Sequence, residues 1–563
     1  MSKFTIYQVL PRLFGNYTAT NKKNGSIIEN GCGKFNRFSL EALNEIKKMG
    51  ITHVWYTGVI EHATQTDYSD FNIRKDHAAI VKGKAGSAYA IKDYYDVDPD
   101  LAEDVENRMA EFEELIKRTH DTGLRVIIDF VPNHVAREYF SDAKPDYVRN
   151  FGEDDQTEYA FNAQNNFYYL PDQQFLPEFD IKGYYEYPAK ATGNDQFSAS
   201  PSVNDWYETI KLNYGVDYFN YQKYFDPVPD TWLKMRDILL FWAGKDVDGF
   251  RCDMAEMVPV EFWGWAIDKV KQKYPNIILI AEVYNPQEYR NYIFNGHFDY
   301  LYDKAGMYDL LRNIICHGYS ASEITRIWQS SSGIEDHMLY FLENHDEQRI
   351  ASAFFAGNPD LAKPAMIVAA TLTKSPVMIY AGQELGETGM DEEGFSGLDG
   401  RTTIFDYWCV KSLQHWANDG EFDGALLTAK QKVLRSFYQK LLQIASSELA
   451  IVKGVMYDLQ YANLYQQEYN SDRQYAYFRQ YGNDLILIVV NFDDHLVEVA
   501  LNIPSESFEY LKIKQNSEFE CRDMMTDETM ENNLILSSDA KITLQIPASY
   551  GRILKLAETQ KDV

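Results

Sequence analysis

The chain has 563 residues, 45% of them hydrophobic, and a formal net charge of −30. This length and composition are typical of a folded protein with more than one domain. No basic cluster is present to neutralise nucleic-acid phosphates, the acidic charge disfavours an anionic membrane surface, and no segment is apolar enough to span a bilayer, so we expect neutral small molecules or glycans as partners.

Short apolar runs alternate with longer amphipathic segments in the first two-thirds of the chain. The apolar runs predict strands at 4–10, 52–56 and 124–131. Segments 39–49 and 107–122 have helical spacing, and a glycine follows each of them. This alternation predicts a parallel sheet with helical crossovers.

The alternation breaks between residues 135 and 225, where Asp, Asn, Tyr and Phe are abundant and no long helical period occurs. We interpret 135–225 as an inserted domain. Helical spacing returns at 230–243, and further strands are predicted at 249–253, 277–282, 298–302, 338–343 and 377–380. Eight strands with helical connections predict a closed (β/α)₈ barrel built from 1–134 and 226–454.

The pattern changes again near residue 455. Predicted strands at 474–478 and 485–492 flank Gly482-Asn483, which favours a tight hairpin, and another strand is predicted at 541–546. These features predict a C-terminal all-β sandwich over 455–563. The predicted fold is therefore an α/β TIM barrel with an insertion after its third strand and a C-terminal β-sandwich domain.

The cysteines argue against a disulfide framework or a zinc site. There are five, an odd number, they are far apart, and no C-x-x-C pair occurs: Cys32, Cys252, Cys316, Cys409 and Cys521. The first residues run directly into a predicted strand, without a basic segment followed by an apolar one. We therefore expect a cytoplasmic protein. The sequence does not indicate its oligomeric state.

Charged side chains end four of the predicted barrel strands. The third, fourth, fifth and seventh strands lead into Asp129 and His134, Arg251 and Asp253, Glu282, and Glu343, His345 and Asp346. In a (β/α)₈ barrel, catalytic groups lie at the carboxyl ends of the strands. One such residue marks only a strand that leaves the core, but four together indicate a catalytic site.

These segments also resemble a known family. Those around Asp129, Asp253, Glu282 and Asp346 resemble the four short motifs of the α-amylase family of glycoside hydrolases, in the same order and on the same strands. Segments 6–12 and 383–386 resemble further family segments. The resemblance implies a barrel, a B domain inserted after strand three and a C-terminal β-sandwich.

The resemblance also implies roles for the charged residues. Asp253 matches the nucleophile, Glu282 the general acid/base, and Asp346 the third carboxylate, which holds ring hydroxyls. Arg251 matches the arginine that keeps the nucleophile ionised, and we expect it to lower the pKa of Asp253. Cleavage with retention requires one carboxylate that attacks while another, still protonated near neutral pH, protonates the leaving oxygen.

Three further residues match substrate-binding positions of the family. His134 and His345 match histidines that hydrogen-bond the sugar at the cleavage site. Tyr89 lies where the family places a tyrosine that stacks on the sugar ring.

The sequence departs from the family pattern at two places. After the nucleophile many α-amylases have Lys-His, and here the matching residues are Glu256 and Met257. The family's calcium-binding segment is matched by Lys211-Leu212-Asn213, and an ammonium group cannot bind Ca²⁺, which requires oxygen ligands. Asn133 matches another calcium ligand. No cofactor is expected, no metal ligand is assigned, and Lys211 and Met257 disfavour Ca²⁺.

We therefore predict a retaining α-glucan hydrolase that cleaves α-1,4-glucosidic bonds in maltooligosaccharides or fragments of starch or glycogen. An α-glucosidase, a neopullulanase-like enzyme and a transglycosylase on the same barrel stay open as alternatives. A non-catalytic glycan-binding or partner module is disfavoured by the complete carboxylate set. The acidic segment from Asp391 to Glu393 and the loop 394–401 either line and gate the cleft or are simply solvated.

Overall fold

The eight predicted barrel strands form one parallel sheet in the computed structural model, which describes residues 3–389 and 397–559. Their order in the sheet is β15-β14-β13-β12-β5-β2-β1-β16. Their bounds are β1 Thr5–Val9, β2 His53–Tyr56, β5 Arg125–Phe130, β12 Gly249–Cys252, β13 Ile278–Ala281, β14 Tyr300–Tyr302, β15 Met338–Leu339 and β16 Val377–Tyr380. A parallel bridge between Tyr340 and Val377 joins the two edges, and the Met378 amide donates to the Tyr340 carbonyl at 2.9 Å. The predicted closed barrel is confirmed.

The seventh strand is shorter than the predicted segment 338–343. After Tyr340 the chain leaves the ladder and turns into a loop that the buried Glu343 carboxylate holds. One oxygen of Glu343 accepts from the Ile350 amide at 2.6 Å and the other from Arg349 at 2.9 Å. Polar anchoring of the loop therefore replaces strand pairing here, and it fixes the segment that carries His345 and Asp346.

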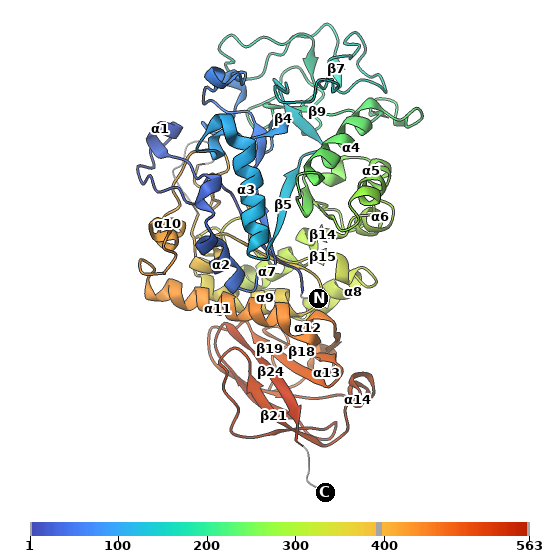
Figure 1. Cartoon of the computed structure of the whole chain (residues 1–563). Helices are drawn as coiled ribbons and strands as arrows, with labels where there is room; N and C mark the ends of the chain where they lie inside the picture. The colour runs from blue at the N-terminus through green and yellow to red at the C-terminus, as the bar shows by residue number, and fades with distance from the viewer. Residues whose placement is uncertain (1–2, 390–396, 560–563) are drawn as a thin grey trace.

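Helices surround the barrel (Figure 1). Those of nine or more residues are α2 Leu40–Lys48, α3 Arg108–Asp121, α4 Asp230–Ala243, α5 Val260–Lys273, α7 Asp309–His317, α9 Lys363–Thr371 and α11 Ala429–Ser447. The shorter helices are α1 Ile27–Asn30, α6 Tyr289–Phe294, α8 Glu323–Ser330, α10 Lys411–Ala417, α12 Leu449–Val452, α13 Gln460–Asn463 and α14 Ser505–Leu511. On α4 the residues at helical spacing, Trp232, Met235, Leu239 and Trp242, are all buried, as an amphipathic helix packed on a barrel requires.

The segment after β5 forms the lobe at the top of Figure 1. It contains short antiparallel strand pairs: β6 His134–Ala136 with β9 Thr209–Lys211, β7 Tyr169–Leu170 with β8 Ala189–Lys190, and β10 Val216–Asp217 with β11 Gln222–Lys223. A further pair, β3 Ile60–His62 with β4 Ile91–Val97, follows β2. Pairing of β6 with β9 sets His134 opposite Lys211 and brings the insert back to the barrel rim. The exact domain boundaries stay a prediction.

The C-terminal part contains two antiparallel sheets. The larger has the order β17-β18-β19-β24-β21-β22, and the smaller pairs β20 with β23. Their bounds are β17 Val455–Asp458, β18 Gln474–Tyr481, β19 Asp484–Asn491, β20 Val497–Leu501, β21 Ser517–Asp523, β22 Leu534–Leu536, β23 Ile542–Ile546 and β24 Tyr550–Glu558. Tyr481 pairs with Asp484 across the predicted Gly482-Asn483 turn. One apolar core, which includes Leu487 and Leu544, joins the two sheets, and the predicted sandwich is confirmed.

Helix α9 joins the barrel to the C-terminal sheet. Every residue from Lys363 to Thr371 except the first is buried, and the helix contacts both β19 and β24. A helix that is apolar on all sides is expected where both sides are covered. Arg479 on β18 strengthens this junction, because its buried guanidinium donates to the Leu372 carbonyl at 2.8 Å and to the Gly454 carbonyl at 2.9 Å.

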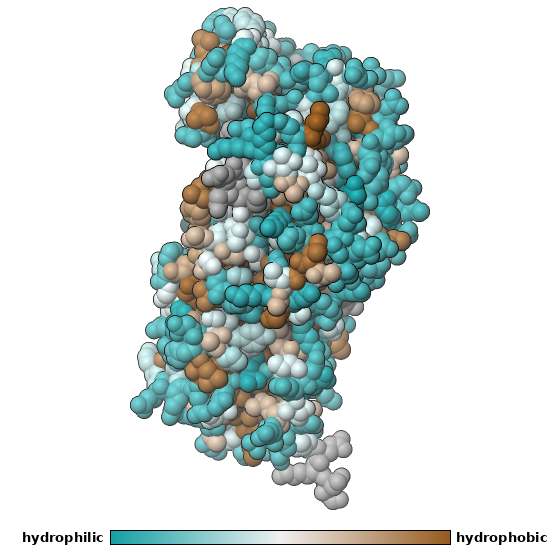
Figure 2. Space-filling view, turned by 90° about the vertical axis from the view of Figure 1, so that its left-hand side faces the viewer, coloured by the Kyte–Doolittle hydropathy of each residue, from teal (hydrophilic) through white to brown (hydrophobic). Residues whose placement is uncertain are grey.

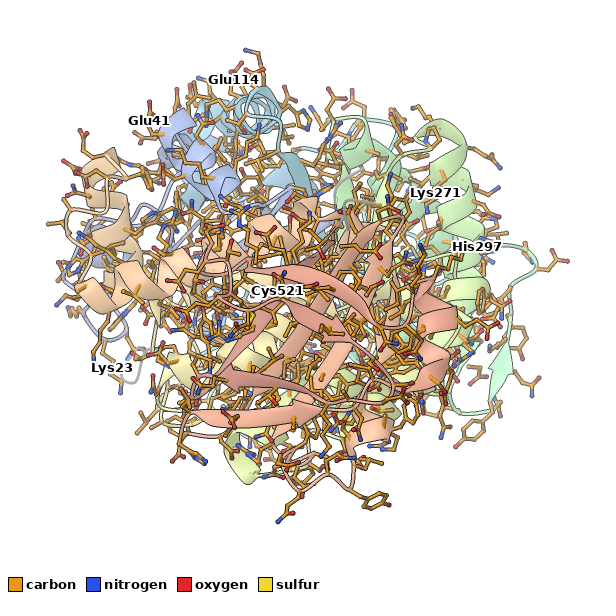
Figure 3. All side chains as sticks on the ribbon, turned by 90° about the horizontal axis from the view of Figure 1, so that it is seen from below. Lys23, Glu41, Glu114, Lys271, His297 and Cys521 are labelled. Carbon is orange, nitrogen blue, oxygen red and sulfur yellow. The ribbon has the colours of Figure 1, made fainter. Side chains whose placement is uncertain are left out.

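The surface agrees with the acidic composition. The face in Figure 2 is mostly hydrophilic, and its hydrophobic residues lie in small separate groups. In Figure 3, seen from below, Cys521 lies within the C-terminal sheet, while Glu41, Glu114 and Lys271 lie near the periphery. All five cysteines are free. Within residues 3–389 and 397–559, none of the helices combines the length and the apolar character needed to cross a membrane.

Candidate active site

Arg251 is at the centre of the charged cluster. It lies on β12, where alternation turns Phe250 and Cys252 into the surrounding core and Arg251 into the barrel. Its Nη1 donates to Asp253 Oδ1 at 2.7 Å, and its Nη2 lies 2.8 Å from Glu282 Oε2. The guanidinium is fully buried. One cation therefore holds the predicted nucleophile and the predicted acid/base side by side.

The pKa of Asp253 differs from the sequence-based expectation. Burial raises it, Arg251 lowers it, and the charges of Glu282 and Asp346 raise it further, so that the pKa lies well above its ordinary value. Arg251 lowers the pKa as expected, but the combined effect of burial and of the two neighbouring carboxylates is larger, so the net shift is upward. The sequence shows the arginine two residues before Asp253, but it does not show that the Asp253 carboxylate is buried and so loses its hydration.

Asp129 supports this arrangement from β5 without reaching the cavity. Its carboxylate accepts from Trp55 Nε1 and from the Gly58 amide, each at 3.1 Å, and lies 3.5 Å from Arg251. The Tyr89 hydroxyl donates to it at 3.3 Å. We infer that Asp129 helps to neutralise the Arg251 guanidinium and orients the side chains of Arg251 and Tyr89.

Glu282 directly follows β13 and is almost completely buried. Its Oε2 accepts from the Met254 amide at 2.8 Å, and its Oε1 accepts from the Tyr284 hydroxyl at 2.6 Å. Met254 has the left-handed backbone conformation, with φ of 43°, where the chain turns after Asp253. The loop after β12 thus orients the carboxylate that ends β13.

Asp346 reaches the same rim through a side-chain turn. The Asn344 side-chain oxygen accepts from the Asp346 amide at 2.8 Å, and His345 Nε2 lies 3.0 Å from Asp346 Oδ2. Burial raises the pKa of Asp346, but His345, Arg251 and Arg401 outweigh it and bring the pKa to about 2. Asp346 therefore stays ionised, which suits a residue that accepts hydrogen bonds from sugar hydroxyls.

Contacts from two distant segments hold His345. The Gln8 side-chain amide on β1 donates to Nδ1 at 2.7 Å, which places the ring proton on Nε2, facing Asp346. The Tyr89 hydroxyl lies 2.5 Å from the same Nε2, and the two rings stack with their centroids 5.1 Å apart. Tyr89 and His345 therefore form one rigid wall of the site.

A cavity of about 330 Å³ contains the predicted catalytic residues. Its lining includes the three carboxylates Asp253, Glu282 and Asp346, the aromatic residues Tyr89, Trp206, Tyr284 and Phe405, and His134, Met254, Lys82, Ser87, Glu208 and Thr209. Burial and the nearby Lys211 lower the pKa of His134 to about 3, so this histidine is neutral. Ionised and aromatic groups together suit a neutral polyhydroxylated ligand, because hydroxyls pair with the former and ring faces with the latter.

Five of the residues predicted for the site line this cavity: Tyr89, His134, Asp253, Glu282 and Asp346. His345 lines a neighbouring cavity together with Asp346, and Arg251 lines neither but contacts Asp253 and Glu282. Sequence reasoning missed Trp206, Tyr284 and the buried ion pair of Lys82 with Glu208, whose charged atoms are 3.0 Å apart. Trp206 and Glu208 come from the insert, which has no regular period. Tyr284 had a detectable signal, because it follows Glu282 by two residues and alternation returns it to the same side.

Lys211 is buried between the insert and the barrel. Its ammonium donates to Asn133 Oδ1 at 2.8 Å and lies 2.5 Å from Asp195 Oδ1. The Asn133 and Asp195 side-chain oxygens are therefore already bound to a cation of the chain itself. These residues do not fit a calcium ion in this arrangement.

Comparison with known proteins decides the family. The family model described as alpha amylase, catalytic domain, matches residues 8–423. The chain belongs to the α-amylase family. The predicted class, a glycoside hydrolase that acts on α-glucosidic bonds, agrees with this membership. The acidic segment at 391–393 and residues 394–396 of the loop 394–401 lie outside the described residues.

Relatives of this α-amylase family member differ in length. It is 25% identical to the α-amylase MalA of Haloarcula japonica over 469 residues, which are 82% of this chain and 53% of that protein. It is also 25% identical to α-amylase 3 of Dictyoglomus thermophilum over 485 residues, 82% of this chain and 83% of that protein. The chain thus spans about half the length of the first relative.

Solved structures show the same fold. The maltogenic α-amylase AmyB of Thermotoga neapolitana superimposes with a TM-score of 0.63 at 20% identity, covering 99% of both chains. An Anoxybacillus α-amylase gives a TM-score of 0.65 at 18% identity, covering 99% of this chain and 98% of the other.

Proposed function

We propose that the protein is a retaining α-glucan hydrolase that cleaves α-1,4-glucosidic bonds in maltooligosaccharides or in fragments of starch or glycogen. The observation that carries the proposal is the single guanidinium of Arg251, which contacts both Asp253 and Glu282. Two carboxylates that contact one guanidinium lie close together. This favours the separation of about 5–5.5 Å between the two catalytic carboxyl groups of retaining glycosidases over the wider separation in inverting ones.

The proposed reaction has two steps. Glu282 gives its proton to the glycosidic oxygen while an Asp253 oxygen attacks the anomeric carbon, so the glycosidic bond breaks and a glycosyl ester forms. The Glu282 carboxylate then takes a proton from water, the water oxygen attacks the same carbon, and the ester breaks. Asp346, His345 and His134 hold ring hydroxyls, and Tyr89 packs against the sugar.

The one proton shared by Asp253 and Glu282 must reside on Glu282 in the reactive form. The two carboxylates contact the same guanidinium, and the charge of Glu282 raises the pKa of Asp253. We expect a bell-shaped dependence of kcat/KM on pH, with one limb for loss of the nucleophile and one for loss of the acid.

Hydrolysis and glycosyl transfer share this chemistry, since they differ only in the acceptor. Similar proteins carry both kinds of name, including a cyclomaltodextrin glucanotransferase of Geobacillus stearothermophilus at 22% identity. Product analysis on maltoheptaose, with and without an added sugar acceptor, tests the proposal. Maltose and shorter hydrolysis products support it, whereas acceptor-linked products support the transglycosylase alternative. A protein that turns over no α-glucoside would favour the alternative of a non-catalytic glycan-binding or partner module.

We further propose that the enzyme works without calcium, because the Lys211 ammonium is bound to Asn133 and Asp195. Excess EDTA is then expected to change the hydrolysis rate by less than about twofold and to leave Tm unchanged, since no ligand is removed. Loss of activity in EDTA that calcium restores would contradict this.

A variant tests the same cation directly. Lys211→Met is expected to lower the stability by about 1–3 kcal/mol, because it leaves the Asn133 and Asp195 oxygens without their cation. The exposed Lys23→Met is the matched control and should leave Tm unchanged. A Lys211→Met protein as stable as the wild type would show that the ammonium does not hold the junction.

A further inference from the structure

Tyr284 contacts Glu282 and has no role in the two proposed reaction steps. Its hydroxyl donates to Glu282 Oε1 at 2.6 Å, while Oε2 accepts from the Met254 amide and faces Arg251. Both oxygens of the acid/base are therefore held by donors. Burial raises the pKa of Tyr284, so its hydroxyl keeps its proton and can only donate to the carboxylate.

Glu256 holds the backbone of the loop that carries Tyr284. Its Oε2 accepts from the Tyr284 amide at 2.7 Å and from the Asn285 amide at 3.1 Å. The Tyr292 hydroxyl in turn donates to the Glu256 carbonyl at 3.1 Å. Glu256 lies three residues after Asp253, where the sequence departs from the family's Lys-His pattern. It thus fixes the loop that directly follows Glu282.

We propose that Tyr284, anchored by Glu256, is a positioning residue that orients the Glu282 carboxyl group and stabilises the anion formed when Glu282 gives up its proton. This inference rests on the proposed function, in which Glu282 is the general acid/base. In the first step the leaving oxygen gains the proton and negative charge develops on Glu282. The Tyr284 hydroxyl then faces a full carboxylate, which must next accept a proton from water.

The other charges around Glu282 determine the expected direction of the pH effect. Arg251 and Asp253 face it from the end of β12 and Tyr302 from β14, and Asp346 lines the same cavity from the loop after β15. Hydrogen-bond donors and a cation favour the ionised form of a carboxyl group, and neighbouring carboxylates disfavour it. Removing the Tyr284 hydroxyl takes away one donor and leaves the others in place, so the acid should keep its proton to higher pH.

The variant Tyr284→Phe separates this effect from packing, because the ring remains. On maltooligosaccharides the basic limb of kcat/KM is expected to move up by roughly one pH unit, and kcat at neutral pH to fall about tenfold, with KM little changed. On an aryl α-maltoside with a nitrophenol leaving group, the fall in kcat for the first step should be much smaller, because that leaving group needs little proton donation.

Two variants of Glu256 provide a second test of the inference that does not depend on the Tyr284→Phe substitution. Glu256→Gln retains an oxygen acceptor for the two loop amides and should resemble the wild type, whereas Glu256→Ala should reproduce part of the shift in the basic limb. Tyr319→Phe, at an exposed tyrosine, is the matched control. A basic limb that does not move in an active Tyr284→Phe enzyme overturns this inference alone. A wild-type protein that hydrolyses no α-glucoside overturns the proposed function, and this inference with it.

Discussion

Replacing Asp253 with asparagine is expected to lower kcat on maltooligosaccharides by on the order of 10⁴-fold or more. The amide has nearly the same shape but cannot attack the anomeric carbon, so no glycosyl ester forms. Arg251 keeps Glu282 and Asp129 as partners, which should preserve the fold. Turnover by Asp253→Asn and by the exposed control Asp70→Asn, measured with matched circular dichroism spectra, checks this.

The same residue determines the acidic side of the pH profile. Because burial and the neighbouring carboxylates raise the pKa of Asp253 despite Arg251, the nucleophile becomes protonated at a higher pH than an ordinary aspartate. Activity should therefore be lost as the pH falls through this raised value. Full activity in Asp253→Asn, or an acid limb at the position of an ordinary aspartate, would contradict the account.

Replacing Glu282 with glutamine is expected to reduce kcat on maltooligosaccharides by roughly 10²–10⁴-fold, because the leaving oxygen receives no proton. An aryl α-maltoside with a good leaving group should still form the glycosyl ester at close to the normal rate. The second step then lacks its base, so the ester should accumulate. Added azide, a nucleophile that needs no base, should release it as the α-glycosyl azide.

The pattern across the two substrates separates a chemical role from a structural one. Glu114→Gln, at an exposed site on α3, is the matched control and should behave like the wild type on both. Equal losses on maltooligosaccharides and on the aryl substrate, without rescue by azide, would show that Glu282 serves the fold or substrate binding rather than proton transfer.

The sequence could predict those parts of the site that follow from strand ends. Asp253 and Glu282 directly follow apolar runs, and the carboxyl ends of parallel barrel strands must meet at one rim. The prediction of the barrel succeeded for the same reason, since its strands are continuous apolar segments. The seventh strand was predicted four residues too long, because polar anchoring by Glu343 replaces strand pairing after Tyr340.

Features that depend on distant parts of the chain could not be predicted in this way. Gln8 and His345 are 337 residues apart, yet their contact fixes the ring proton that faces Asp346. Trp206 enters the cavity from an insert without regular periodicity. The direction of the pKa shift of Asp253 depends on the burial of its carboxylate, which the spacing of residues in the sequence does not reveal. Sequence spacing thus identifies which groups meet, while the fold determines their protonation.

The anomeric form of the first product tests the central claim most directly. Proton NMR of a maltooligosaccharide digest, recorded at high enzyme concentration before mutarotation, follows the new reducing end. Two displacements at the same carbon, first by Asp253 and then by water, predict that the α-anomer appears first and only later converts to the equilibrium mixture. If the β-anomer appears first, water attacks directly, and Asp253 is not the nucleophile.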